Sequence, residues 1–228
     1  MAFRIFDVSN NETKEASSND IVGRFRSGHQ INGRPMALSA WRVTGADPVA
    51  LETISDIMGG SEEKPERWDT KSDETFEVFT TSTSVDIILD GPNALKTGMV
   101  LWGRKTRIRE CDGVSQTDEA ASDCACPSDI RERKEAAKNG TACEPSIQVY
   151  FRMAANPELG KLKFFTGSWS MAKEIGAAED KLAKIDGPAT ATLSLELVSF
   201  TTKDGKDITY TKPVLEVHEA VDADAELF

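Results

Sequence analysis

Apolar residues recur at helical spacing in two parts of the chain, and residues that favour helix ends flank both. In the first part, Asp47 precedes Pro48, and two glycines at positions 59 and 60 end the run. Its apolar residues are Val49, Ile54, Ile57 and Met58. Because Asp is favoured at the N-cap and Pro at the first helical position, this pattern predicts a short helix after Asp47.

A longer amphipathic helix is predicted ahead of Gly187 and Pro188. Its apolar residues follow one another at spacings of four and three and are Met171, Ile175, Ala178, Leu182 and Ile185. We expect this apolar face to pack on the core, with a partner surface as the alternative. A third, mostly polar helix is predicted from an N-cap at Ser128 to a C-cap at residues 139–140, and we expect it to be exposed.

Alternation of apolar and polar residues predicts strands in most of the remaining chain. The clearest case is a hairpin around a turn at residues 203–206. Its apolar residues are Leu193, Leu195 and Leu197 before the turn and Ile208, Tyr210 and Val214 after it. Further strands are predicted at residues 76–79, 85–89, 99–109, 147–153 and 162–166, and a polar loop at residues 61–75. Runs of strands with scattered helices predict an α+β fold with a mainly antiparallel sheet.

The two ends of the chain differ in composition from the rest. Residues 1–20 include a polar run without apolar periodicity, which predicts a flexible N-terminal lead-in. Residues 218–228 are acidic and contain no Lys or Arg, which predicts a flexible acidic tail. Between these ends we expect residues 21–217 to form a single α+β domain.

The net charge limits the partners of the chain. Its 228 residues include 38 Asp and Glu against 27 Lys and Arg, a formal charge of −11 with a pI near 4.8. Because such a field repels phosphate backbones and anionic membranes, the composition excludes a general nucleic-acid coat protein. No run approaches the ~20 apolar residues that cross a bilayer, and the N-terminus lacks a signal-peptide pattern, so we expect a cytoplasmic protein without membrane contacts.

All four cysteines lie in one polar segment, residues 111–143. They are Cys111, Cys124, Cys126 and Cys143. Disulfides are not expected in a reducing compartment. Four thiolates brought together by loops match the closed tetrahedral coordination of a structural zinc ion and leave no open position for catalysis. The sequence therefore favours a zinc-binding, Cys-rich insertion, with reduced thiols or a metal-free loop as the alternative.

Residues 21–46 have the opposite charge to the rest of the chain, with four arginines and no Asp or Glu. A basic segment interleaved with aromatic residues can dock an acidic partner or nucleic acid. The candidate partner-binding residues are Arg24, Phe25, Arg26 and Arg34. The simpler interpretation, which the pattern favours, is a strand whose arginines face solvent while Val22, Phe25 and Trp41 face the core.

Known catalytic motifs are absent from the sequence. It contains no Gly-x-Ser-x-Gly elbow, Walker A loop or dinucleotide fingerprint. The two histidines, His29 and His218, lie in a Gly-rich turn and in the acidic end, and we interpret both as surface residues. We therefore expect a protein without catalytic residues, with an enzyme of unrecognised class as the alternative.

Short strings along the whole chain carry a family resemblance. In the first half they are residues 22–28 (VGRFRSG), 32–35 (NGRP), 38–44 (LSAWRVT), 88–92 (ILDGP), 100–104 (VLWGR) and 111–114 (CDGV). In the second half they are residues 124–127 (CACP), 143–146 (CEPS), 149–152 (VYFR), 167–170 (GSWS) and 210–214 (YTKPV). Together they resemble the actinobacteriophage recombination directionality factors, from about residue 21 to residue 217.

This resemblance implies a partner protein, the large serine integrase of a cognate phage or prophage in a bacterial host. The integrase alone joins attP to attB, whereas the factor binds the integrase, permits attL × attR excision and disfavours integration. The resemblance implies no catalytic residues, and DNA contact only through the integrase. The alternative function is a phage DNA-replication or DNA-processing accessory protein with a structural zinc site, which the arginine–aromatic segment and the cysteines support.

Overall fold

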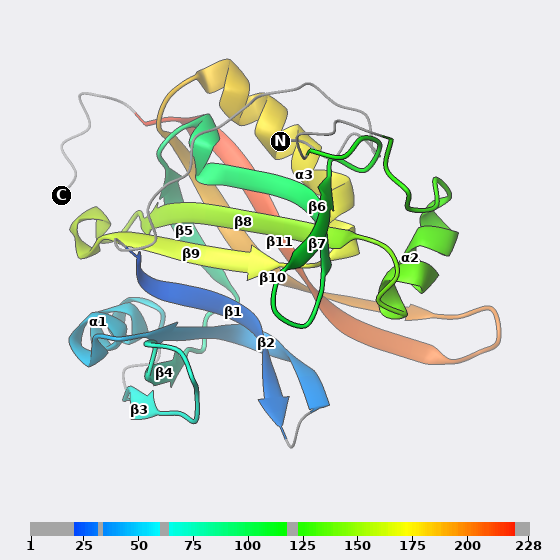
Figure 1. Cartoon of the computed structure of the whole chain (residues 1–228). Coiled ribbons are helices and arrows are strands. Elements are labelled where there is room, and N and C mark those ends of the chain that lie inside the picture. The colour runs from blue at the N-terminus through cyan, green and yellow to red at the C-terminus, as the bar shows by residue number, and fades with distance from the viewer. Residues whose placement is uncertain (1–20, 32–33, 60–63, 118–122, 222–228) are drawn as a thin grey trace.

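The fold is a mainly antiparallel sheet with three α-helices around it (Figure 1). The computed structural model describes residues 21–31, 34–59, 64–117 and 123–221. In these residues the strands are β1 (Ile21–Ile31), β2 (Arg34–Gly45), β3 (Glu66–Arg67), β4 (Phe76–Phe79), β5 (Ser84–Leu89), β6 (Leu95–Trp102), β7 (Arg107–Cys111), β8 (Glu144–Met153), β9 (Lys161–Thr166), β10 (Ala189–Thr201) and β11 (Asp207–Ala220). The helices are α1 (Pro48–Ile57), α2 (Ile130–Lys138) and α3 (Trp169–Ile185).

Strand β8 lies at the centre of the sheet, between partners from distant parts of the chain. One edge of β8 pairs with β9, and the other pairs with β6 along its first half and with β5 at its end. The sheet continues from β9 through β1, β2 and β4 to β3, and from β5 through β10 to β11. Among the described strands, only β1 and β9 pair in parallel. The predicted mainly antiparallel sheet is therefore confirmed.

Helix α3 covers the sheet beside β11 and closes the core (Figure 1). It begins at Trp169, two residues before the predicted apolar stripe, because the Ser168 hydroxyl accepts a hydrogen bond from the backbone N–H of Met171 at 3.3 Å. The buried stripe residues are Met171, Ile175, Ala178 and Leu182, with Ile185 half-buried. This burial supports the core-packing interpretation and contributes about 1.5–3 kcal/mol for each large side chain.

Carboxylates cap the two shorter helices. Asp47 accepts a hydrogen bond from the backbone N–H of Val49 at 2.9 Å, as predicted for α1. The predicted N-cap of α2 at Ser128 is wrong, since Asp129 accepts hydrogen bonds from the backbone N–H groups of Arg131 and Glu132 at 2.9 and 3.0 Å. One carboxylate there satisfies two N–H groups that lack partners within the helix.

The single strand predicted at residues 99–109 is two strands. Strands β6 and β7 pair antiparallel, with Met99 opposite Cys111. The backbone N–H of Gly103 donates to the carbonyl of Thr106 at 2.9 Å and closes the turn between them. The turn residues 103–106 read GRKT, and this run of Gly and polar residues, which interrupts the alternation, was the available signal for the turn.

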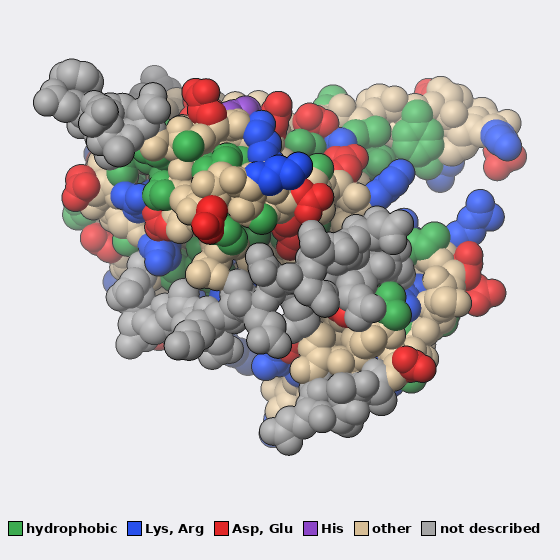
Figure 2. Space-filling model, turned by 90° about the horizontal axis from the view of Figure 1, so that it is seen from above, with side chains coloured by type: hydrophobic (Ala, Val, Ile, Leu, Met, Phe, Trp, Pro, Cys, Tyr) green, Lys and Arg blue, Asp and Glu red, His purple; other side chains and the backbone are tan. Residues whose placement is uncertain are grey.

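Beyond the sheet, β10 and β11 continue as a two-stranded arm, residues 197–211 (Figure 1). The predicted hairpin is confirmed, and near the sheet its Leu193 and Leu195 are buried. Along the arm, Phe200 and Tyr210 are exposed and contact each other edge to face, with ring centroids 6.5 Å apart. Figure 2 shows hydrophobic side chains along this arm, at the upper right of the view.

Strand β11 ends later than the predicted boundary at residue 217. Residues 218–220 remain in the strand, where Ala220 pairs with Ala189 and His218 shares a hydrogen bond of 2.8 Å with Thr192. The one acidic residue of this stretch, Glu219, is exposed at the edge strand. The predicted lead-in, residues 1–20, and the rest of the predicted tail, residues 222–228, lie outside the described residues.

Candidate metal centre and basic sheet face

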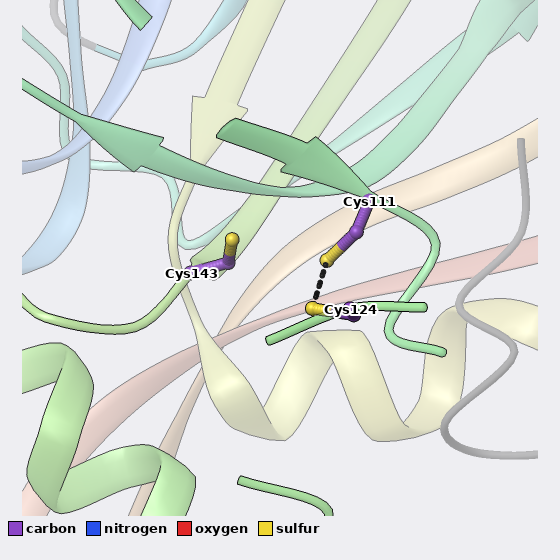
Figure 3. A group of neighbouring side chains, drawn as sticks. All are labelled: Cys111, Cys124 and Cys143. Carbon is purple, nitrogen blue, oxygen red and sulfur yellow. Dashed lines mark hydrogen bonds between the residues drawn. The ribbon is translucent and has the colours of Figure 1, made fainter. Parts of the chain in front are cut away.

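Three cysteine side chains meet between β7, β8 and the segment that connects them (Figure 3). The sulfur atoms of Cys111, Cys124 and Cys143 all lie within 4.8 Å of one another. The sulfur atoms of Cys124 and Cys111 are 3.3 Å apart, and the Cys124 thiol donates a hydrogen bond to Cys111. None of these cysteines forms a disulfide. The three thiols together could hold a metal ion.

A tight turn after β7 brings Cys124 back to Cys111. The Asp112 carboxylate accepts hydrogen bonds from the backbone N–H groups of Val114 and Ser115, at 2.9 and 2.8 Å. Gly113 has a φ of 100°, a conformation that glycine adopts without steric cost. The backbone N–H of Cys124 then donates to the carbonyl of Val114 at 2.8 Å. Local backbone geometry therefore sets two cysteines, thirteen residues apart, side by side.

The fourth cysteine, Cys126, lies beside this group, but its sulfur atom is not among the three that lie within 4.8 Å of one another. Its sulfur accepts hydrogen bonds from the backbone N–H of Cys143 at 3.2 Å and from Arg109 Nη1 at 3.3 Å. Its thiol also interacts with the thiols of Cys124 and Cys143. Sulfur atoms bound to one zinc ion at about 2.3 Å lie roughly 3.8 Å apart, and those of Cys111, Cys124 and Cys143 lie within 4.8 Å of one another.

The four thiols differ in acidity because their burial and their hydrogen bonds differ. A hydrogen bond with Cys143 lowers the pKa of Cys111 to about 6, and the same bond raises the pKa of Cys143. Burial raises the pKa of Cys124 to about 12. Burial alone would raise the pKa of Cys126, but hydrogen bonds, first among them that from the backbone N–H of Cys143, lower it overall. A bound cation would stabilise all four thiolates together.

Two arginines supply positive charge to this cluster, and sequence reasoning missed both. Arg109 donates to Cys126, and this hydrogen bond raises the pKa of the guanidinium. Arg133 is only 2% exposed; its Nε donates to the Pro127 carbonyl at 2.7 Å, and its charge helps to lower the pKa of Cys111. Among the described residues, Arg133 Nη1 has no hydrogen-bond partner. Because a buried cation is costly without a nearby negative charge, this placement favours a thiolate at Cys111.

The structure separates the candidate partner-binding residues on β1 and β2. Phe25 is 1% exposed and packs edge to face against Trp41 and Phe151, so its assignment as a partner-binding residue is wrong. Strand alternation points Phe25 into the core and its neighbours Arg24 and Arg26 to the opposite face. Arg34 is exposed at the start of β2, at the far end of the β1–β2 hairpin.

A single carboxylate pairs with both arginines of β1. Glu74 forms ion pairs with Arg24 and with Arg26, the latter at 2.9 Å, and it also accepts a hydrogen bond from Thr44 at 2.7 Å. Glu74 belongs to the polar loop predicted at residues 61–75, in which residues 66–67 instead form strand β3. The basic segment is therefore partly neutralised by a residue that lies far from it in sequence.

Lysines and aromatic residues from later strands extend the basic face, and sequence reasoning missed them. Lys163 on β9 lies directly opposite Arg24 on β1. Lys96 and Lys163 both lie over the ring of Tyr150, at 5.5 and 5.1 Å from its centroid. Phe165 follows Lys163 on the same face. The signal for this face in the sequence was Phe165, because it is a large apolar residue at a solvent-facing position of β9.

Comparison with known proteins gives one family. No solved structure matches the chain. In the described part of the chain, no helix is both long enough and apolar enough to cross a membrane. A model of the Gp3-like family, described as recombination directionality factor-like, matches residues 22–218, which run from the start of β1 almost to the end of β11. The chain therefore belongs to the Gp3-like, recombination directionality factor-like family.

Proposed function

We propose that this chain is a recombination directionality factor that binds the large serine integrase of its cognate phage or prophage in the bacterial cytoplasm. It activates attL × attR excision and inhibits attP × attB integration, and it catalyses no step itself. The observation that carries this proposal is the family match over residues 22–218. In this role the chain reaches the att sites through the integrase.

Differential binding is sufficient for such a role. A ligand shifts an equilibrium between two arrangements of its partner only by the difference between its affinities for them. Moving the integrase population from 1:99 to 99:1 requires about 10⁴-fold tighter binding to the favoured arrangement. The net charge of −11 supports association with a basic recombinase without competition for the DNA phosphates.

A recombination assay with purified proteins tests this function. The cognate integrase is incubated with attL and attR, or with attP and attB, in the presence and absence of this protein. We expect excision only when the protein is present, and reduced integration. If the integrase is active alone and neither reaction changes at saturating protein, the proposed function is refuted.

We also propose that Cys111, Cys124, Cys126 and Cys143 bind a structural zinc ion. Four sulfur ligands are typical of structural zinc sites and leave no position for a reacting water. Zinc with four thiolates carries a net charge of −2, and Arg109 and Arg133 lie beside the cluster as the two compensating cations. Arg133 is buried and pairs with no carboxylate of the described residues, which supports charged sulfur ligands over neutral thiols.

Metal analysis of protein purified without added metal tests the zinc site. We expect one zinc ion per chain, and loss of zinc in Cys124→Ser and Cys143→Ser. Ser128→Ala, an exposed change in the same segment, is the control and should keep its zinc. Near-zero zinc in freshly purified, folded protein would exclude the site.

A further inference from the structure

A hollow of about 500 Å³ opens on the solvent-facing side of the sheet, over β1, β8, β9 and the end of β6. Its charged lining residues are Arg24, Arg26 and Lys163, and its exposed aromatic residues are Trp102 and Phe165. No Asp or Glu of the described residues lines it. A lining with cations and no carboxylate is distinctive in a chain with many more carboxylates than cations. The volume of the hollow is in the range of ligand-binding sites.

The two aromatic rings of the hollow face solvent. Trp102 is 52% exposed at the end of β6, and Phe165 is 50% exposed on β9. The neighbours of Phe165 in sequence, Phe164 and Thr166, are buried on the other side of the sheet. The core therefore does not use the rings of Trp102 and Phe165, and both are available for stacking.

The positive charges extend across four adjacent strands, from Lys96 on β6 to Lys163 on β9 and Arg24 on β1. At about 4.8 Å between neighbouring strands, this row spans roughly 14 Å. Together with Arg26, these are four cations against one paired carboxylate, Glu74. Burial, followed by the charges of Arg24 and Lys96, lowers the pKa of Lys163, which shows how closely the cations are packed.

We infer that this sheet face binds a single-stranded nucleic acid, with bases stacked on Trp102 and Phe165 and phosphates beside Lys163, Arg24 and Lys96. Stacking of bases on exposed aromatic residues within a cationic groove is the usual basis of single-strand binding. In a duplex the base faces are covered, so duplex DNA would leave both rings unused. An acidic peptide would match the cations but would leave the two rings without flat partners.

This inference goes beyond the proposed function, in which DNA contact is indirect. It is compatible with the net charge of −11, because binding requires a positive potential only along the groove. It also replaces the partner-binding role predicted for Arg24 and Arg26 with a specific ligand. Because binding depends on contacts between cations and phosphates, it should be strongest at low salt.

Fluorescence anisotropy with the full-length, zinc-replete protein and a labelled oligothymidylate of about 12 nucleotides tests the inference. We expect the single strand to bind more tightly than a duplex of the same length. Trp102→Ala and Phe165→Ala should each weaken binding about 5- to 150-fold, the range for loss of one stacked base. Lys163→Ala should weaken binding and reduce the slope of log affinity against log salt by about 0.7.

Two variants on the arm are matched controls. Phe200→Ala removes an exposed aromatic ring, and Lys203→Ala removes an exposed lysine, each remote from the hollow. Both should bind the oligonucleotide as the unmodified protein does, and circular dichroism should show that all variants are folded.

Three outcomes would overturn the inference. The first is that the protein binds no oligonucleotide at low salt, and the second is that it binds duplex and single strand with equal affinity. The third is that the arm variants lose as much affinity for the oligonucleotide as Trp102→Ala and Phe165→Ala do. If the hollow variants instead lose integrase binding while the unmodified protein binds no oligonucleotide, the face is a protein contact. The recombination assay is read separately, so failure here leaves the proposed function standing.

Discussion

Replacing Arg133 with Met tests whether the sulfur atoms beside it carry negative charge. The guanidinium is almost fully buried, its Nε donates to the Pro127 carbonyl, and no carboxylate of the described residues pairs with it. Methionine fills a similar volume and favours helix, so the substitution mainly removes the charge. The sign of the resulting change in stability depends on the charge of the sulfur atoms.

The expected magnitude follows from the burial of Arg133. If the sulfur atoms are thiolates on zinc, Arg133→Met breaks a buried charge pair and should lower the free energy of unfolding by about 3–5 kcal/mol. For a chain of this size, that loss lowers Tm by about 6–20 °C. If the thiols are neutral, the change removes an uncompensated buried charge, and stability should stay the same or increase.

Urea unfolding of zinc-loaded protein, followed by circular dichroism, measures the difference. Arg131→Met, on the exposed side of the same helix, is the matched control and should change stability by no more than about 0.5 kcal/mol. The zinc content of each variant is measured in parallel. If Arg133→Met retains its zinc and is as stable as the unmodified protein, the charge-compensation argument is refuted.

Three further predictions concern the fold. Leu182→Ala, in the buried stripe of α3, should lower the free energy of unfolding in urea by about 2–5 kcal/mol, and a loss under 1 kcal/mol would contradict the packing described. Gly160→Ala should cost about 1–3 kcal/mol in the same assay, because φ is +114° and a Cβ would lie 2.6 Å from Val22 Cγ2; Gly176→Ala, with open space around it, is the control. Burial raises the pKa of Glu179 in the folded protein above its pKa in the unfolded chain. Ionisation of this carboxyl therefore destabilises the fold as the pH rises from the unfolded-state pKa through the folded-state pKa. Glu179→Gln should therefore raise the urea midpoint at alkaline pH but not in acid, and an equal gain at both would contradict this cause.

Local patterns predicted the helices and the long hairpin well. Asp47 and Pro48 mark the start of α1, and the alternation around residues 203–206 marks the arm, because capping and strand pairing there involve neighbours in sequence. The parallel pairing of β1 with β9 was not predictable, since one strand pattern carries no information about its distant partner. The turn between β6 and β7 was missed because the prediction extended one strand through residues 103–107, a run without an apolar side chain.

The candidate metal ligands were predictable from their clustering, but their charge partners were not. Arg133 lies in a helix whose other side chains are mostly polar and exposed, and nothing in that pattern marks the one position that is buried. The basic sheet face was missed for a different reason. Its side chains come from β1, β6, β8 and β9, and only the sheet pairing brings them together.

The position of β5 between β8 and β10 has a consequence for synthesis on the ribosome. The apolar side chains of β5 at Val85, Ile87 and Leu89 are buried in the finished sheet, yet both neighbouring strands follow β5 in the chain. The first of these pairings joins Ile88 to Arg152, 64 residues later. At about 5–20 residues per second, translation leaves this strand unpaired for about 3–13 s. During that interval β5 is the part of the nascent chain most open to chaperones or to the strand edge of another copy. An mRNA that slows translation between β5 and β8 should therefore lower the yield of native protein.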